Sequence, residues 1–226
     1  ARSKNLHVIN TPASSSESVA ELVFAHLFTG VRFLHDSNRN MPLEGDTNFD
    51  GLKKAYANGI ELRGKTLGII GYGNIGSQVS VLAEGLGMKV VYYDSETKLP
   101  LGNANSCKSI KDVVGKSDIV TLHVPETNQT KNLINKTNLK YFKPGSILIN
   151  YARGEVVDLN ALAKSLQDGQ IGGVAIDVFP VEPEKNGDAF TTPLQGLSNV
   201  LLTPHIGGST EEAQQNIGED VSTKLL

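Results

Sequence analysis

The sequence predicts an α/β protein in which a doubly wound parallel sheet is covered by helices on both faces. Two observations support this fold class. Short apolar runs alternate with helical patterns along most of the chain, and a glycine-rich turn joins the first run to the first helix after it. Because runs such as Ile119-Val-Thr-Leu122 are almost continuously apolar, we expect strands that are buried on both sides. The expected strands lie at 65–71, 88–94, 118–124, 146–151, 172–178 and 199–203.

The glycine turn at residues 71–76 predicts a nucleotide site. Gly71 allows a tight turn out of the strand, Gly73 lets backbone N–H groups approach a pyrophosphate, and Gly76 lets the next helix pack closely on the sheet. A pyrophosphate would lie at the helix N-terminus, where unpaired N–H groups and the helix dipole favour an anion. A helical pattern and a second strand follow, so the motif has the context of a dinucleotide-binding Rossmann domain.

Asp94 indicates which dinucleotide binds. It ends the second expected strand, about twenty residues after the glycine turn, where a carboxylate contacts the adenosine ribose. A carboxylate accepts hydrogen bonds from the ribose hydroxyls and repels a 2′-phosphate, so we predict NAD rather than NADP. Ser95 and Glu96 follow it, whereas an NADP site usually has an arginine there. The alternative is that Asp94 and the glycines only shape turns.

Composition narrows the possible partners. The chain has 226 residues, 39% of them hydrophobic, and a formal net charge of −3 at pH 7. This charge gives no reason to expect nucleic acid or an anionic membrane as a partner, and no apolar run reaches the roughly twenty residues of a membrane-spanning helix. The single cysteine, Cys107, excludes an internal disulfide and fits a cytoplasmic protein. We interpret it as structural, and no spacing of His, Cys and Asp indicates a metal site.

Polar residues collect where the later expected strands end. Arg153 follows one strand, Glu182 the next and His205 the last, and ligands of open α/β sheets bind outside these carboxyl ends. A guanidinium can bind a carboxylate through two hydrogen bonds, and an imidazole can take a hydroxyl proton while hydride leaves the same carbon. A glutamate beside the imidazole would fix its tautomer. Together these residue types indicate a site that oxidises a hydroxy acid, although each one alone could be an ordinary strand-end or surface residue.

Three segments in this order resemble the D-isomer-specific 2-hydroxyacid dehydrogenase family, and the resemblance extends over nearly the whole chain. They are Arg153-Gly, Asp177-Val-Phe-Pro-Val-Glu182-Pro and Thr203-Pro-His205-Ile-Gly-Gly-Ser-Thr. The resemblance implies that His205 donates and accepts the proton, that Glu182 is its partner, and that Arg153 anchors the substrate's carboxylate and reacting oxygen.

The same resemblance implies the residues that hold NAD. Asp177 would lie near the nicotinamide amide, and His123 and Pro125 on the adenine side. Tyr151 is larger than the residue that the family often has there, which could alter the nicotinamide pocket. The remaining implied NAD contacts are Asn74, Ile75, Asp94, the backbone of Tyr151, Ala152 and Arg153, and the turn that contains His205, Gly207 and Gly208.

Two further segments, at 93–104 and 211–218, resemble one branch of the family. That branch oxidises 3-phospho-D-glycerate with NAD to 3-phosphohydroxypyruvate and NADH, the first step of serine biosynthesis. One alternative is a dehydrogenase for another D-2-hydroxy acid, such as D-lactate, D-glycerate or D-2-hydroxyglutarate. A second is an NAD-sensing binding protein of the co-repressor type, which shares the fold and even the Arg, Glu and His. The residues alone leave these alternatives open.

The resemblance also implies a domain organisation. Residues 1–63 would hold the end of a substrate lobe, a linking or dimerisation helix and a connection, residues 64–208 the NAD-binding Rossmann domain, and residues 209–226 a C-terminal linking helix. The stretch at 6–10 has the pattern of a strand end. We therefore expect the N-terminal substrate lobe and any C-terminal regulatory domain to be absent, and the isolated chain to bind NAD with little or no turnover.

A helix is expected at 17–35, with Ser14 and Glu17 spaced as a capping box. Because it is apolar over much of its circumference, we expect it to be buried against something outside the nucleotide core. The matching helix of the family lies at the subunit interface, which implies a homodimer or higher homo-oligomer; packing on the absent lobe is the alternative. A polar connection at 36–64 follows, with a short helix near 52–57.

Local signals predict other helix ends. Asp158 is expected to cap one helix that Gly169 ends, and Ser209 and Glu212 have the spacing of a capping box for the last helix. Three histidines outside the motifs are expected to be structural or surface residues: His7, His26 and His35.

Overall fold

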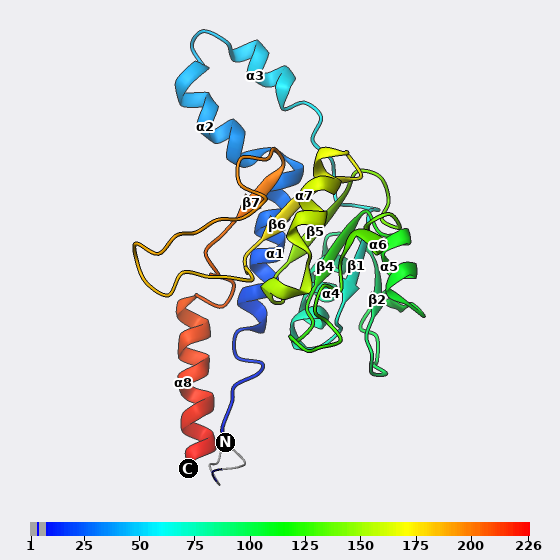
Figure 1. Ribbon diagram of the computed structural model, residues 1–226, viewed down its shortest axis with the longest axis vertical. Coiled ribbons are helices and arrows are strands. Elements are labelled where there is room, and N and C mark those ends of the chain that lie inside the picture. Colours follow the sequence, from blue (N-terminus) through cyan, green and yellow to red (C-terminus); the bar gives the residue numbers. More distant parts are fainter. Residues whose placement is uncertain (1–3, 5–7) are drawn as a thin grey trace.

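The computed structural model describes Lys4 and residues 8–226, which contain a sheet of seven parallel strands packed between helices (Figure 1). The strand order is β3-β2-β1-β4-β5-β6-β7. The strands are β1 (Thr66–Ile70), β2 (Lys89–Tyr93), β3 (Asn105–Ser106), β4 (Ile119–Leu122), β5 (Ser146–Asn150), β6 (Ile171–Ile176) and β7 (Val200–Leu202). The predicted doubly wound parallel sheet is confirmed.

The sheet grows outward from β1 in two directions. The chain adds β2 and β3 on one side of β1 and then returns to place β4 on its other side. In such sheets a crevice forms at this switch point, outside the carboxyl ends of the strands, and ligands bind there. The six predicted strands are all present. β3 was not predicted, because its two residues are polar and exposed and show no apolar pattern.

Helices cover both faces of the sheet. Two of them, α1 and α4, lie on one face, and α5, α6 and α7 lie on the other. The bounds are α1 (Ser16–Val31), α2 (Leu34–Glu44), α3 (Phe49–Ala55), α4 (Asn74–Gly85), α5 (Ile110–Lys116), α6 (Lys136–Leu139), a 3-10 turn at Gly154–Val156, α7 (Leu159–Gln167) and α8 (Glu211–Leu225). In Figure 1, α2 and α3 project from one end of the molecule and α8 from the other.

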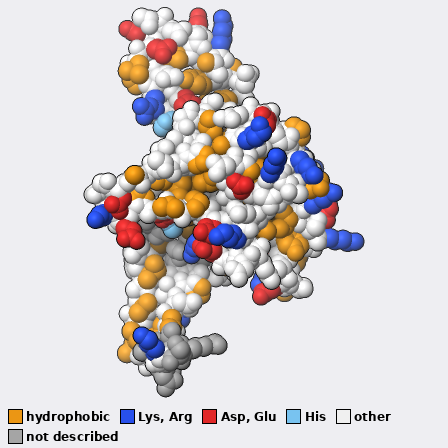
Figure 2. Space-filling model, in the orientation of Figure 1, with side chains coloured by type: hydrophobic (Ala, Val, Ile, Leu, Met, Phe, Trp, Pro, Cys, Tyr) orange, Lys and Arg blue, Asp and Glu red, His pale blue; other side chains and the backbone are white. Residues whose placement is uncertain are grey.

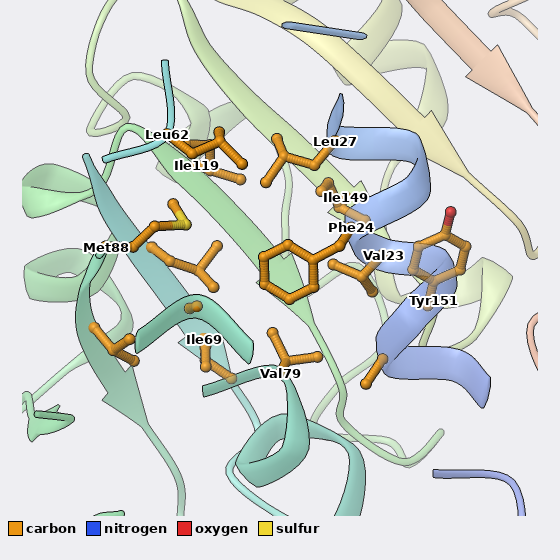
Figure 3. Close-up of a cluster of buried hydrophobic side chains, with 14 of the residues drawn as sticks. Val23, Phe24, Leu27, Leu62, Ile69, Val79, Met88, Ile119, Ile149 and Tyr151 are labelled. Carbon is orange, nitrogen blue, oxygen red and sulfur yellow. The ribbon is translucent and has the colours of Figure 1, made fainter. Parts of the chain in front are cut away.

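Helix α1 packs on the nucleotide-binding core itself, so the expectation that it is buried outside that core was wrong. Figure 3 shows Phe24 and Leu27 of α1 among side chains of the sheet and of α4, and Phe24, Ile149 and Val79 belong to one buried cluster. The reason is topological. The helices α5, α6 and α7 pack on the opposite face, which leaves β5 to β7 open on this face for α1 to cover.

The helix expected at 17–35 is interrupted. α1 ends at Val31, Phe33 adopts a left-handed conformation with φ of 53°, and α2 begins at the next residue. The stretch expected to be a connection, 36–64, therefore holds most of α2 and all of α3, where one short helix near 52–57 was expected. α2 has no buried residue, and so the sequence shows no apolar period there.

One of the three predicted helix N-caps is present in the structure, and the other two were wrong. Asp158 caps α7 as expected, because its Oδ1 accepts hydrogen bonds from two backbone N–H groups of the first turn, and Gly169 follows with φ of 74°. The capping box of Ser14 was wrong, since Ser15 is the N-cap of α1 and makes no side-chain cap bond. α8 is capped by Thr210 and not by Ser209.

The stretch at 6–10, which has the pattern of a strand end, lies partly outside the described residues. His7 is one of the residues outside them, and residues 8–10 form no regular element. Within the part of the chain that the structure describes, each helix is too short or too polar to cross a lipid bilayer.

Candidate active site

The glycine turn has the geometry that its three glycines predict. Gly71 has φ of 93°, and a Cβ there would lie 2.5 Å from the carbonyl oxygen of His123. A Cβ on Gly76 would lie 2.2 Å from the carbonyl oxygen of Gly71, so only glycine lets α4 approach the turn this closely. Gly73 differs, because a Cβ there would meet nothing within 4 Å. Its missing side chain therefore leaves open space at the N-terminus of α4, which no side chain caps.

Asp94 joins the glycine turn to the end of β2. Its Oδ2 accepts a hydrogen bond from the backbone N–H of Tyr72 at 2.7 Å, and its Oδ1 accepts one from the N–H of Glu96 at 2.9 Å. A carboxylate has about four lone-pair positions, so these two bonds leave acceptor capacity for the hydroxyls of a ribose. Asp94 thus holds the glycine turn through Tyr72, and its contact with a ribose stays a prediction.

His123 lies at the switch point, directly after β4. Its backbone N–H donates to the carbonyl of Ile70 at 2.8 Å, and its Nε2 lies 2.9 Å from Thr121 Oγ1. Burial lowers the pKa of His123 to about 3, so its imidazole is neutral. The Nδ1 atom is buried and has no hydrogen-bond partner among the described residues. Pro125, two residues later, is exposed.

The residues at the N-terminus of α4 complete this end of the site. Asn74 is exposed, and its Nδ2 donates to the carbonyl of Pro12 at 3.2 Å. Ile75 is half-buried and packs against the cluster that α1 and α4 share. Both residues lie in the first turn of α4, and their contacts with NAD stay a prediction.

His205 and Glu182 form a pair at the other end of the carboxyl edge. His205 Nδ1 lies 2.8 Å from Glu182 Oε2, and Glu182 Oε1 accepts a hydrogen bond from the N–H of Phe179 at 3.0 Å. Partial burial raises the pKa of Glu182, but the hydrogen bonds from His205 and Phe179 and the charge of Arg153 outweigh it and hold this pKa below its ordinary value. Glu182 is therefore ionised at neutral pH and orients the imidazole.

Asp177 holds the turn that carries His205. Its carboxylate is buried, with 2% of the residue exposed, and it accepts three hydrogen bonds from this turn. The donors are Thr203 Oγ1 at 2.6 Å, the N–H of Ile206 at 2.9 Å and the N–H of Gly207 at 2.8 Å. His205 itself has φ of 54°, a left-handed conformation that costs energy unless its surroundings hold it. The contact of Asp177 with the nicotinamide amide stays a prediction.

Asn150 holds the turn that carries Arg153. It is fully buried at the end of β5, where its Oδ1 accepts from the N–H of Ala152 at 3.0 Å and its Nδ2 donates to the carbonyl of Arg153 at 3.0 Å. A Cβ on Gly154 would lie 1.9 Å from the carbonyl carbon of Phe179, so this glycine lets the turn approach the segment leading to Glu182. The side chain of Arg153 is exposed beside that segment.

Tyr151 points away from this turn and toward α1. Its ring is buried, stacks on His26 with centroids 5.7 Å apart, and its hydroxyl is hydrogen-bonded to His26 Nδ1 (Figure 3 shows Tyr151 beside α1). The large side chain of Tyr151 is thus buried in the hydrophobic cluster between α1 and the sheet. The effect of Tyr151 on a nicotinamide pocket stays a prediction.

The structure brings the predicted residues to one edge of the sheet in two groups. Gly71, Asp94 and His123 lie at the ends of β1, β2 and β4, and Arg153 and His205 follow β5 and β7. Gly207 and Gly208 complete the turn after His205, packed on α1. Among the described residues no three His, Cys, Asp or Glu side chains gather as a metal site would require.

Sequence reasoning missed several residues that support this edge. Asn150 and Thr203 had a signal, since a polar residue at the end of an apolar strand favours a turn through side-chain bonds to the backbone. Ser18 and His26, which contact the same turns from α1, had none. Their partners, Gly207 and Tyr151, lie far away in the sequence.

Comparisons with known proteins show the family of the chain. The chain matches the family described as "D-isomer specific 2-hydroxyacid dehydrogenase, NAD binding domain" over residues 24–207. It is 49% identical to the D-3-phosphoglycerate dehydrogenase of Haemophilus influenzae and 50% identical to that of Escherichia coli K12, with 100% of this chain and 54% of each relative covered. The chain therefore spans about half the length of these curated relatives.

A solved structure extends the comparison to a ligand complex. The D-lactate dehydrogenase of Aquifex aeolicus complexed with NAD and lactic acid superposes with a TM-score of 0.82 and 31% sequence identity, covering 99% of this chain and 69% of that one. The family match includes the glycine turn, Asp94 and the paired His205 and Glu182. The chain thus belongs to the D-isomer specific 2-hydroxyacid dehydrogenase family and carries the NAD-binding domain of that family.

Proposed function

We propose that the protein containing this chain is an NAD-dependent dehydrogenase that oxidises 3-phospho-D-glycerate to 3-phosphohydroxypyruvate. The observation that carries the chemistry is the contact of 2.8 Å between His205 Nδ1 and Glu182 Oε2, at the same sheet edge as the glycine turn. The names of the relatives from Haemophilus influenzae and Escherichia coli support the choice of substrate. A role in serine biosynthesis follows from that choice.

The proposed mechanism assigns one task to each of three side chains. Glu182 accepts the Nδ1–H of His205, which leaves Nε2 as the basic nitrogen that takes the proton of the substrate's 2-hydroxyl. Arg153 binds the substrate's carboxylate and the reacting oxygen through its guanidinium. NAD, when bound, accepts the hydride from the carbon that bears the hydroxyl. The hydroxy acid thus loses one hydride and one proton, and in the reverse reaction His205 returns the proton.

The cofactor contacts are proposed on the geometry of the same edge. The pyrophosphate would lie over Gly73 and the free N–H groups of α4, and the ribose diol would bind Asp94. The nicotinamide would then extend toward Asp177 and His205. The other proposed contacts are Gly71, Asn74, Ile75, Gly76, His123, Pro125, the backbone of Tyr151, Ala152 and Arg153, and Gly207 and Gly208.

Steady-state kinetics of the complete protein test this function. With NAD, 3-phospho-D-glycerate should give a higher kcat/KM than D-lactate, D-glycerate or D-2-hydroxyglutarate, and NADP should be a poor cofactor. A higher kcat/KM for one of the other acids would mean that the proposed reaction type is right and that the proposed substrate is wrong. Absence of turnover with every acid, together with tight NADH binding, would instead favour an NAD-sensing binding protein. The chain of 226 residues covers 54% of these two relatives, and by itself it should bind NADH and show little or no turnover.

We further propose that the protein forms a homodimer through α1, α2 and α3. Figure 2 shows hydrophobic side chains among charged ones on the projecting part of the molecule that α2 and α3 form. Large apolar side chains are exposed along these helices, namely Phe28, Leu34, Met41, Leu43 and Phe49. A second copy would remove this surface from water.

Sedimentation of the complete protein tests the dimer. Replacing Leu34 and Met41 by Asp should shift it toward monomers, whereas Leu99→Asp, at a position 88% exposed on another part of the surface, should not. A monomeric unmutated protein would exclude this interface. We also place the protein in the cytoplasm, because its single cysteine allows no internal disulfide in this chain.

A further inference from the structure

Helix α1 makes a hydrogen bond to each of the two turns that carry the proposed catalytic residues. Near its N-terminus, Ser18 Oγ donates to the carbonyl oxygen of Gly207 at 2.6 Å. Near its middle, His26 Nδ1 is bonded to the hydroxyl of Tyr151. Gly207 lies two residues after His205, and Tyr151 lies two residues before Arg153. Helix α1 is thus bonded both to the turn that carries His205 and to the turn that carries Arg153.

The bond from Ser18 completes the support of the His205 turn. The N–H of Gly207 donates to Asp177 Oδ2 at 2.8 Å, while the carbonyl of the same residue accepts from Ser18. A Cβ on Gly207 would lie 3.0 Å from Asp177 Oδ2 and 3.4 Å from a methyl carbon of Val19, so the turn is in direct contact with α1. Both Ser18 and Gly207 are buried, and water does not compete for this bond.

The bond from His26 reaches the Arg153 turn through the side chain of Tyr151. Burial lowers the pKa of His26, with the charge of Asp177 opposing this effect, so its imidazole is neutral at pH 7. Burial and the charge of Asp177 both raise the pKa of Tyr151, so its hydroxyl keeps its proton, and the tautomer of His26 decides whether this hydroxyl or Nδ1–H is the donor. The stacked rings add contact area, and the backbone of Tyr151 leads directly to Ala152 and Arg153.

We propose that Ser18 and the pair of His26 and Tyr151 are positioning residues that set the separation of His205 and Arg153. A helix is a stiff spacer with a rise of about 1.5 Å per residue, so Ser18 and His26 are held about 12 Å apart along α1. Turns attached to these two points move as one body with the helix. Catalysis depends on such placement, because a misplacement of about 1 Å can cost about 100-fold in rate. This inference rests on the proposed dehydrogenase function.

Kinetics of two hydroxyl deletions in the complete protein test the proposal. Ser18→Ala and Tyr151→Phe should each lower kcat about 10-fold, while KM for the acid and the Kd of NADH change less than about twofold. Because both bonds set one separation, the double variant should lose less than the product of the two single losses. A loss equal to that product would show two separate effects and overturn the shared role.

Two control variants test whether deleting any hydroxyl group in this part of the protein lowers kcat. Thr29→Ala deletes a hydroxyl on the same helix that donates to the carbonyl of Ala25 within α1, at 2.7 Å. Tyr56→Phe deletes a hydroxyl that accepts from Asn40 Nδ2 at 2.6 Å, away from the sheet edge. Both should keep the unmutated kcat. Equal losses in the controls, or an unchanged kcat in Ser18→Ala and Tyr151→Phe, would overturn the proposal.

A spectroscopic readout keeps the positioning role testable if the proposed function fails. Should the unmutated protein turn over none of the D-2-hydroxy acids, the proposed function falls, and the imidazole NMR signals of His205 in isotopically labelled protein become the readout. Ser18→Ala should shift these signals and Thr29→Ala should not. Unchanged His205 signals in Ser18→Ala would overturn the positioning role on its own terms.

Discussion

The nucleotide end and the reacting end of the site lie on the same sheet edge but are built differently. The nucleotide end consists of residues 71–94 and His123, in which the glycine turn and Asp94 contact each other across neighbouring strands. The reacting end joins Arg153, Glu182 and His205, which come from three separate turns. Buried Asn150 and Asp177 hold the turns of Arg153 and His205 by hydrogen bonds. Helix α1 is also bonded to both turns, through Ser18 and His26.

This difference indicates which amino-acid substitutions should affect each end. The nucleotide end depends on backbone shape, because its proposed donors are N–H groups and the close approach of α4 to the turn depends on the missing side chain of Gly76. The reacting end depends on side chains that are held by other side chains, so a substitution outside the site can alter it. Substitutions in the two ends should therefore separate cofactor binding from turnover.

The largest effect is expected for His205→Asn in the complete protein. Removing the proton acceptor should lower kcat by about 10²- to 10⁴-fold, while NADH affinity stays within about twofold because the nucleotide end is intact. Stopped-flow turnover and NADH fluorescence titration measure the two quantities. Glu182→Gln, which keeps the shape but loses the charge beside the imidazole, should reduce kcat less and change its dependence on pH. Near-normal turnover of His205→Asn would remove this residue from the mechanism.

Two glycine substitutions test the dependence of the nucleotide end on backbone shape. Gly76→Ala places a Cβ 2.2 Å from the carbonyl oxygen of Gly71, so it should lower the free energy of unfolding by about 1–3 kcal/mol and weaken NADH binding. Gly73→Ala meets nothing within 4 Å, so it should leave stability within about 0.5 kcal/mol and still weaken NADH binding. Urea unfolding and NADH titration measure both variants. Normal NADH affinity in Gly73→Ala would show that the pyrophosphate does not approach there.

His123 should make stability depend on pH at the nucleotide end. Its pKa is about 3 in the folded protein and near 6.5 when unfolded, so between these values the unfolded chain binds a proton that the folded chain does not. The free energy of unfolding should therefore fall by up to about 1.4 kcal/mol per pH unit as pH decreases from 6.5 toward 3. Urea unfolding across this range should show a shallower slope for His123→Gln. Identical slopes for the two proteins would mean that the imidazole is protonated in the fold.

The smallest effect is expected for Asp94→Ala. Loss of the ribose acceptor should weaken NADH binding about fivefold to tenfold and narrow the preference for NAD(H) over NADP(H), since the charge that repels a 2′-phosphate is gone. Glu96→Ala is the control, because this neighbouring carboxylate is exposed and pairs with Lys98. Equal affinities for NADH and NADPH in the unmutated protein would contradict the cofactor assignment.

Much of the nucleotide end could be predicted because its signals are local. Gly71, Gly73 and Gly76 all lie within residues 71–76, and each acts through its own missing Cβ. Apolar runs predicted the six longer strands, while β3 was missed because pairing with β2 at its edge position needs no apolar face. At the reacting end, the order of the motifs pointed to His205 and Glu182 together. Their Nδ1 and Oε2 atoms lie 2.8 Å apart, and their catalytic roles stay a prediction.

The sequence by itself determined the parallel sheet, the glycine turn and the three polar turns at its carboxyl edge, because strand period and glycine spacing act over a few neighbouring residues. Only the tertiary structure decided that α1 covers the open face of β5 to β7 and bonds to Gly207 and Tyr151. A helix with an apolar face can be buried against any apolar surface of matching shape. Which surface it covers depends on the faces that the crossover helices leave open, and that is a property of the whole sheet.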